Sequence, residues 1–231
     1  MTVKAVVFDL DGTLADFNLD YMAVRAEVRE FLIREGIPAS VLVVNESIFE
    51  MLKKAQIYLR NTRKSESKID HVRNKVLDIA EQRELEAARD TGLIPGAVDT
   101  MKTLARMGLK LGLCTINSEK AVGLILKRFR IADYFDAVVP RNRVKQVKPN
   151  VEHLEATLKA LKVRPDEAMV VGDGSVDMRC ASELGVLAVG IPTEQSSPDQ
   201  LMRAGANYVV TSIADLPTLI EDINQTRDAL P

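Results

Sequence analysis

Two aspartates, one residue apart, directly follow the first apolar segment of the chain. Residues 3–8 read Val-Lys-Ala-Val-Val-Phe, and residues 9–13 read Asp-Leu-Asp-Gly-Thr. The apolar run is typical of a buried parallel strand. Carboxylates such as Asp9 and Asp11 are costly at the end of such a strand unless a metal, a cation or a reaction needs them. The alternative is a polar turn in which Asp and Gly serve only the backbone geometry.

Three other sets of residues that could take part in chemistry lie next to apolar or helical segments. Thr115 ends the run Leu-Gly-Leu-Cys, and Lys148 stands with a proline just ahead of a helical pattern. Asp173 and Asp177 belong to Gly-Asp-Gly-Ser-Val-Asp, after another apolar run. Taken singly, these groups are explained by a helix cap, a solvated lysine and a turn. Together, however, these groups and the first two aspartates all fall at carboxyl-side ends of predicted parallel strands. This indicates one site, because ligands of open α/β sheets bind at that edge.

The elements that would position these groups alternate along the C-terminal half. The predicted strands are 109–115, 137–139, 168–171, 186–189 and 208–210, and the predicted helices are 118–129, 151–161, 175–184, 198–204 and 216–223. Asn150 is well placed as the N-cap of the second of these helices. Strands separated by helices predict an α/β fold, with a Rossmann-like parallel sheet core and helices on both faces.

The segment from about residue 20 to residue 90 has a different pattern. It shows helical periodicity and predicts three or four helices, with breaks at 36–38 and 61–67; only the run Val-Leu-Val-Val at 41–44 is ambiguous. We therefore expect an inserted all-helical cap domain, residues 17–92, in a catalytic core formed by residues 1–16 and 93–231. Such an insertion would lie as a lid over the carboxyl edge of the sheet.

Composition restricts the classes of partner and the compartment. The chain has 31 basic and 33 acidic side chains, which gives no global argument for nucleic acid or an anionic membrane as partner. We find no bilayer-spanning run and no signal-peptide pattern, so we expect a cytoplasmic protein. Cys114 and Cys180 lie in apolar segments and are interpreted as reduced core residues. With only His71 and His153 as histidines, a zinc site is disfavoured.

The order of these motifs resembles the haloacid dehalogenase superfamily of phosphohydrolases. That order is DxDGT, a helical insertion, Thr at a strand end, Lys-Pro and then GDxxxD, and it spans essentially the whole chain. Residues 94–97, Ile-Pro-Gly-Ala, and residues 133–136, Asp-Tyr-Phe-Asp, are also similar to the phosphoglycolate-phosphatase-like branch with a helical cap.

The resemblance implies a role for each acidic group. Asp9 would be the nucleophile that forms an aspartyl-phosphate, and Asp11 the general acid and base. Mg²⁺ would be bound by Asp9, by the backbone carbonyl of Asp11 and by Asp173. Asp177 would act through a water on the metal or by orienting Lys148. The residues expected to support the site are Asp177, Gly12 and Thr13.

Phosphate binding is implied for three further residues. Thr115 and Lys148 would hold the phosphoryl oxygens, with Lys148 also reducing the repulsion between Asp9 and an anionic substrate. Many relatives have Asn directly after the strand-end Thr, but here Ile116 intervenes. Asn117 either points at the phosphate or caps the helix that starts at residue 118.

We therefore predict a Mg²⁺-dependent phosphatase acting on a small soluble phosphomonoester, phosphoglycolate or a similar phosphorylated metabolite. We expect a monomer or homodimer that binds neither nucleic acid nor membrane. Asp11 argues against a dehalogenase, which needs no proton donor there, and against an ATPase pump, which has Thr. The alternatives are a sugar phosphomutase of the same superfamily and a non-catalytic binding protein on this fold.

A basic stretch in the predicted cap bears on substrate choice. Residues 53–75 contain eight basic side chains against two acidic ones: Lys53, Lys54, Arg60, Arg63, Lys64, Lys68, Arg73 and Lys75. This stretch is either a solvated helical face or a patch for a second negative group of the substrate. The absence of an aromatic ladder disfavours a nucleic-acid substrate.

Overall fold

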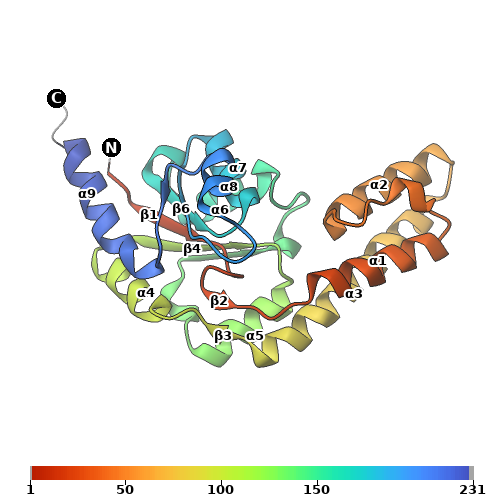
Figure 1. Ribbon diagram of the computed structural model, residues 1–231, viewed down its shortest axis with the longest axis horizontal. Helices are drawn as coiled ribbons and strands as arrows, with labels where there is room; N and C mark the ends of the chain where they lie inside the picture. The colour runs from red at the N-terminus through yellow and green to blue at the C-terminus, as the bar shows by residue number, and fades with distance from the viewer. Residues whose placement is uncertain (1, 229–231) are drawn as a thin grey trace. The chain divides into compact units, whose positions relative to one another are not determined.

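The computed structural model describes residues 2–228, and they form two compact units (Figure 1). One unit contains the chain up to Phe17 and from Thr91 onward, and the other is Asn18–Asp90. No helix within the described residues has both the length and the apolar character needed to cross a membrane.

A six-stranded parallel sheet forms the centre of the first unit, in the order β5-β4-β1-β6-β7-β8. The strands are β1 (Ala5–Phe8), β4 (Lys110–Thr115), β5 (Ala137–Pro140), β6 (Ala168–Gly172), β7 (Leu187–Gly190) and β8 (Tyr208–Val209). Strand β1 lies between β4 and β6 and is fully buried, as its apolar run predicts. The predicted α/β fold with a parallel sheet is confirmed.

Helices cover both faces of this sheet (Figure 1). They are α4 (Ala97–Arg106), α5 (Glu119–Phe129), α6 (Val151–Leu161), α7 (Ser175–Leu184), α8 (Pro198–Arg203) and α9 (Leu216–Asp228). Helices α6, α7 and α8 pack on one face, and α4, which contacts α9, packs on the other. Asn150 caps α6 as predicted, because its side chain accepts a hydrogen bond from the backbone N–H of Glu152. The short 3₁₀ turns of this unit are Ala132–Tyr134, Arg141–Arg143, Pro165–Glu167 and Ile213–Asp215.

The second unit is all-helical and has its own core. It consists of α1 (Tyr21–Arg34), a 3₁₀ turn (Ala39–Val41), α2 (Ile48–Asn61) and α3 (Glu66–Asp90). One buried apolar stripe from each helix forms the core: Val24, Val28, Leu32, Met51, Ala55, Leu59, Ile69, Val72 and Val76. Both predicted breaks are present, and the ambiguous segment 41–44 forms no strand. The lid position of this unit stays a prediction.

The structure also contains elements that the sequence patterns did not predict. One is helix α4, whose N-cap residue is Gly96, with a φ of +84° and no side-chain hydrogen bond to cap the helix. Strands β2 (Ala15–Asp16) and β3 (Gly92–Leu93) form an antiparallel pair where the chain leaves and re-enters the first unit. Two residues per strand are too few for any periodicity to register. The other elements differ from prediction mainly in the residues at which they begin and end. Strand β1, for example, begins at Ala5 rather than at residue 3.

Candidate active site

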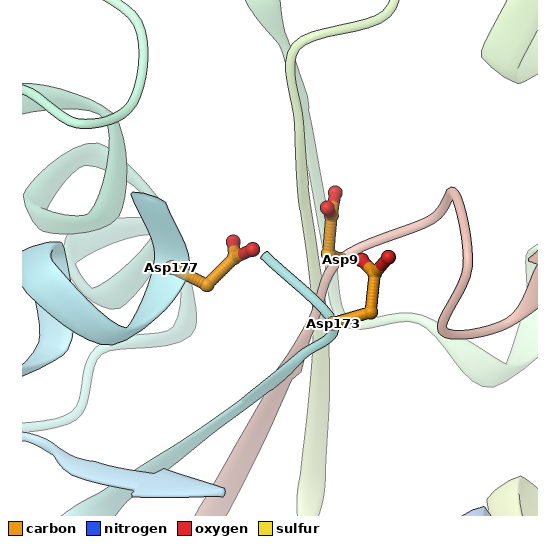
Figure 2. A group of neighbouring side chains, drawn as sticks. All are labelled: Asp9, Asp173 and Asp177. Atoms are coloured by element: carbon orange, nitrogen blue, oxygen red, sulfur yellow. The ribbon is translucent and has the colours of Figure 1, made fainter. Parts of the chain in front are cut away.

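Three carboxylates converge at the carboxyl ends of neighbouring strands. Asp9 follows β1, Asp173 follows β6, and Asp177 lies in the first turn of α7. One carboxylate oxygen from each lies within 4.8 Å of one from each of the others. Figure 2 shows Asp9 and Asp173 beside each other, with Asp177 extending from its helix toward them. The pairing of β1 with β6 explains the arrangement, because it brings residues 164 positions apart to one edge of the sheet.

The turn after β1 holds Asp9 and leaves space for Asp173. The backbone N–H of Leu10 donates to Asp9 Oδ1 over 2.8 Å, and the Asp9 N–H donates to the Val171 carbonyl over 2.9 Å. Gly12 has a φ of +68°, and a Cβ atom there would lie 2.3 Å from Asp173 Oδ2. Glycine is therefore required at residue 12, both for the backbone conformation and for the close approach of Asp173.

Lys148 connects two of the carboxylates. Its Nζ lies 3.0 Å from Asp9 Oδ1 and 2.5 Å from Asp177 Oδ1, and it donates to the Cys114 carbonyl over 2.8 Å. The side chain is only 2% exposed. Burial opposes its charge, but the negative charges of Asp177 and Asp9 outweigh burial and raise the pKa of Lys148. Lys148 is therefore a fixed positive charge beside Asp9.

The remaining negative charge of the cluster suits a hard divalent cation. Burial, and then the charges of Asp9 and Asp177, raise the pKa of Asp173 to about 7. Burial also raises the pKa of Asp177, against the opposing effect of Lys148. In the described part of the chain, the buried Oδ2 of Asp177 has no hydrogen-bond partner. The three carboxylates offer only oxygen ligands, and a single ammonium does not neutralise them, so the cluster fits Mg²⁺. Asp9 and Asp173 were the side chains expected to bind it.

Thr115 and Asn117 lie at the end of β4, on the other side of β1. Thr115 is fully buried, and its Oγ1 accepts a hydrogen bond from the Asn117 N–H over 3.2 Å. The side-chain Nδ2 of Asn117 donates to Asp11 Oδ1 over 2.8 Å. Helix α5 is capped by Ser118, whose hydroxyl accepts from the Ala121 N–H. Of the two predicted roles for Asn117, capping thus belongs to its neighbour, and the amide side chain meets Asp11.

The supporting residues have different surroundings. Asp177 contacts Lys148 directly, which was one of the two arrangements expected for it. Thr13 is fully buried, and its hydroxyl has no hydrogen-bond partner among the described residues.

Cys114 and Cys180 are buried free thiols, and burial raises the pKa of Cys114 to about 12 and that of Cys180 to about 11. As predicted, the cysteines are reduced core residues.

Sequence reasoning missed His153, whose ring contacts the backbone of Lys148. Its Nδ1 accepts from the backbone N–H of Lys148 over 3.5 Å, and its Nε2 lies 2.9 Å from the Val139 carbonyl. Burial, helped by the charge of Lys148, lowers the pKa of His153 to about 4. A histidine in the first turn of the helix after Lys148 was the available signal, but the patterns only excluded it as a zinc ligand.

Three members of the basic stretch in the second unit take part in ion pairs. Lys54 pairs with Glu46, and Lys68 pairs with Glu35. Arg60 lies 3.7 Å from Glu66, and both side chains are more than half exposed. An exposed ion pair such as Arg60–Glu66 is typical of a solvated helical face and contributes little to stability.

Comparison with known proteins agrees with this geometry. Residues 6–191 match the family model of haloacid dehalogenase-like hydrolases. Phosphoglycolate phosphatase 1 of Pseudomonas aeruginosa is 28% identical over 233 aligned positions, covering 99% of this chain and 79% of that protein. Pyrophosphatase PpaX of Halalkalibacterium halodurans is 27% identical, covering 95% of this chain and 98% of that protein. The crystal structure of a hydrolase from Pseudomonas syringae superimposes with a TM-score of 0.66 at 24% identity, covering 96% of this chain and 99% of that one. With the family pattern matched over most of its length, the chain belongs to the haloacid dehalogenase-like hydrolases.

Proposed function

We propose that this hydrolase is a Mg²⁺-dependent phosphatase that cleaves a small soluble phosphomonoester through an aspartyl-phosphate on Asp9. Phosphoglycolate is the leading substrate, because the relative from Pseudomonas aeruginosa carries that name and aligns over 99% of this chain. The observation that carries the proposal is the convergence of Asp9, Asp173 and Asp177, with the ammonium of Lys148 beside Asp9 and Asp177.

Asp9 has the surroundings of a carboxylate nucleophile. Its Oδ1 accepts from the Leu10 N–H and lies 3.0 Å from Lys148 Nζ, so two donors fix the orientation of the group. Both donors lie on Oδ1, which leaves the pair of electrons on Oδ2 for the attack on phosphorus. The fixed charge of Lys148 also offsets the repulsion between Asp9 and an approaching anion.

Mg²⁺ would be held by Asp9, Asp173 and the backbone carbonyl of Asp11. When bound, it would neutralise charge on the phosphoryl oxygens and so help the anionic substrate approach Asp9. Thr115 would donate a hydrogen bond from its hydroxyl to a phosphoryl oxygen, because its Oγ1 already accepts from the Asn117 N–H.

Asp11 would complete the cycle by moving a proton. It would protonate the leaving oxygen as the phosphorus–oxygen bond of the substrate breaks, and then accept a proton from the water that attacks the aspartyl-phosphate. A binding protein has no need for such a group, which argues against the non-catalytic alternative.

Inorganic pyrophosphate is the second substrate candidate. The relative from Halalkalibacterium halodurans is named as a pyrophosphatase and is 27% identical to this chain, almost as similar as the phosphoglycolate phosphatase. The same nucleophile, lysine and acid would serve for pyrophosphate, with phosphate as the leaving group.

Phosphate release from a panel of compounds tests the proposal. The panel contains phosphoglycolate, sugar phosphates and pyrophosphate, each with Mg²⁺ and with a chelator. We expect hydrolysis that needs Mg²⁺ and that falls on the order of a thousandfold or more in Asp9→Asn. Asp16→Asn, at an exposed aspartate of the same unit, is the matched control and should keep full rate. Full activity in Asp9→Asn would remove Asp9 as nucleophile, and isomerisation without phosphate release would favour a phosphomutase.

A further inference from the structure

Asn117 connects the loop after β4 to the loop after β1 through a single side-chain contact. Its Nδ2 donates to Asp11 Oδ1 over 2.8 Å, across 106 positions of sequence. Asn117 is only 2% exposed, so water competes little for this hydrogen bond. An amide donor on a carboxylate oxygen fixes the rotation of the carboxylate group.

The backbone around Asn117 is itself held in place. The Asn117 N–H donates to Thr115 Oγ1, and its carbonyl accepts from the Arg141 N–H over 3.1 Å. The buried guanidinium of Arg141 donates to the Ile116 carbonyl over 3.1 Å. One residue further, Asn142 Oδ1 accepts from the Glu119 N–H over 2.9 Å. The 3₁₀ turn after β5 therefore fixes the segment that carries the amide, and the amide is preorganised.

We propose that Asn117 is a positioning residue for Asp11, whose amide holds the Asp11 carboxyl group in one orientation for proton transfer. This proposal rests on the proposed function, in which Asp11 is the acid and base. Because Oδ1 accepts from a preorganised amide, the carboxyl group cannot rotate freely about its bond to Cβ. The donor therefore keeps the acid and base aimed in one direction.

The proton follows a balanced path in both half-reactions. In the first, Asp9 forms a bond to phosphorus, the bond to the leaving oxygen breaks, and the proton of the Asp11 carboxyl group passes to that oxygen. In the second, a water oxygen bonds to phosphorus, the bond to Asp9 breaks, and a water proton passes to the Asp11 carboxylate. The products are an alcohol and phosphate. Asn117 remains bonded to Oδ1 throughout and neither gives nor takes a proton.

Two substrates with different leaving groups distinguish this role from direct phosphate binding. An alkyl phosphate such as phosphoglycolate needs a proton on its leaving oxygen, whereas 4-nitrophenolate leaves without one. With Asn117→Ala, we expect kcat on phosphoglycolate to fall roughly ten- to a hundredfold, because a misdirected acid loses part of its effect. On p-nitrophenyl phosphate we expect a loss of less than about threefold, and KM should not change for either substrate.

Two further variants keep the test independent of folding. Asn117→Asp preserves the volume but removes the amide donor, so it should show the same selective loss on phosphoglycolate. Ser118→Ala is the matched control in the same loop: it removes the cap of α5 and should lower the melting temperature. It should leave the ratio of the two rates as in the wild type.

Equal losses on both substrates, a raised KM, or no loss at all would overturn the proposal. If the wild type hydrolyses neither phosphate, the proposed function fails, and a measurement on the metal-free protein then decides the contact alone. We expect the side-chain amide ¹H–¹⁵N signal of Asn117 to move in Asp11→Asn and to stay unchanged in Asp16→Asn. An unmoved signal in Asp11→Asn would show that the amide does not hold Asp11.

Discussion

Excess negative charge is the main property of the site residues. Lys148 lies within hydrogen-bonding distance of Asp9 and Asp177, and the pKa of Asp173 is the one raised to about 7. Close carboxylates in a buried site destabilise one another's ionised forms, and a divalent cation removes this cost. The charge balance of the site therefore couples metal binding to the stability of the fold.

This coupling predicts how stability changes with pH. The folded chain retains the Asp173 proton up to about pH 7, whereas an unfolded chain releases it near 3.8, the ordinary pKa of an aspartate. Because the folded state binds more protons in that window, the contribution of Asp173 to stability falls as pH rises from about 4 to about 7. We expect Mg²⁺ to raise the melting temperature more at pH 8 than at pH 6, where it must displace a proton. Differential scanning calorimetry with Mg²⁺ or a chelator measures this, and equal shifts at both pH values in the wild type would contradict it. Asp173→Asn should show little shift at either pH.

Gly12→Ala tests the close approach at the turn after β1. The added Cβ would lie 2.3 Å from Asp173 Oδ2, so one metal-binding carboxylate must move. We expect Mg²⁺ affinity to fall at least about tenfold, because displacement of a ligand or its support costs roughly this much. Gly36→Ala is the matched control, since its φ is +89° but no atom lies within 4 Å of its Cβ position. Both variants pay the backbone strain, so an equal Mg²⁺ affinity in the two, measured by calorimetric titration, would refute the steric argument.

The elements of the sheet were predictable because each central strand is a short apolar run that ends in a polar group. Strands β1, β4 and β6 carry this pattern, and Asn150 marks the start of α6. Helix α4 was missed because residues 94–97 were used for the family resemblance, and the helical pattern after them was not considered. The contact of Asn117 with Asp11 was not predictable, because it depends on a side-chain direction set by Arg141 and the loop after β5. The gathering of the aspartates follows from the general rule that carboxyl ends of parallel strands meet at one edge; the pairing of particular donors does not.

His153 gives helix α6 a pH-dependent role. The folded state holds this histidine neutral with a pKa of about 4, whereas an unfolded chain protonates it near pH 6.5. Its contribution to stability is therefore complete above pH 6.5 and is lost as pH falls toward 4, by about 2 kcal/mol at pH 4.5. We expect urea denaturation to show this extra loss between pH 7 and pH 4.5 in the wild type but not in His153→Gln. The carboxylates, including Asp173, titrate in both proteins and cancel in the comparison. Parallel pH profiles would show that His153 is protonated as readily in the folded state as in the unfolded one.

The residues of the proposed site all lie outside the inserted helical unit. Every residue of the proposed site, from Asp9 to Asp177, belongs to the unit that contains the sheet, and Asn18–Asp90 has a core of its own. We predicted the boundaries at residues 16/17 and 92/93, and the contacts divide the chain next to Phe17 and Thr91. The two crossings lie together, because Asp16 pairs with Gly92 in the β2–β3 ladder. The first unit can therefore be closed without the second.

Replacing residues 18–90 with a short Gly-Ser linker tests this separation. The paired strands β2 and β3 keep the two cut ends adjacent, so closure costs little chain entropy. We expect the shortened protein to unfold cooperatively and its melting temperature to rise with Mg²⁺, since Asp9 and Asp173 remain on β1 and β6. The same deletion with Asp9→Asn should lose most of that rise. Hydrolysis of p-nitrophenyl phosphate should persist, while preference among phosphorylated metabolites should weaken, because the proposed cap would set substrate choice. A shortened protein that folds but no longer responds to Mg²⁺ would mean that the inserted unit supplies part of the metal site, and the assignment of the chemistry to one unit would be wrong.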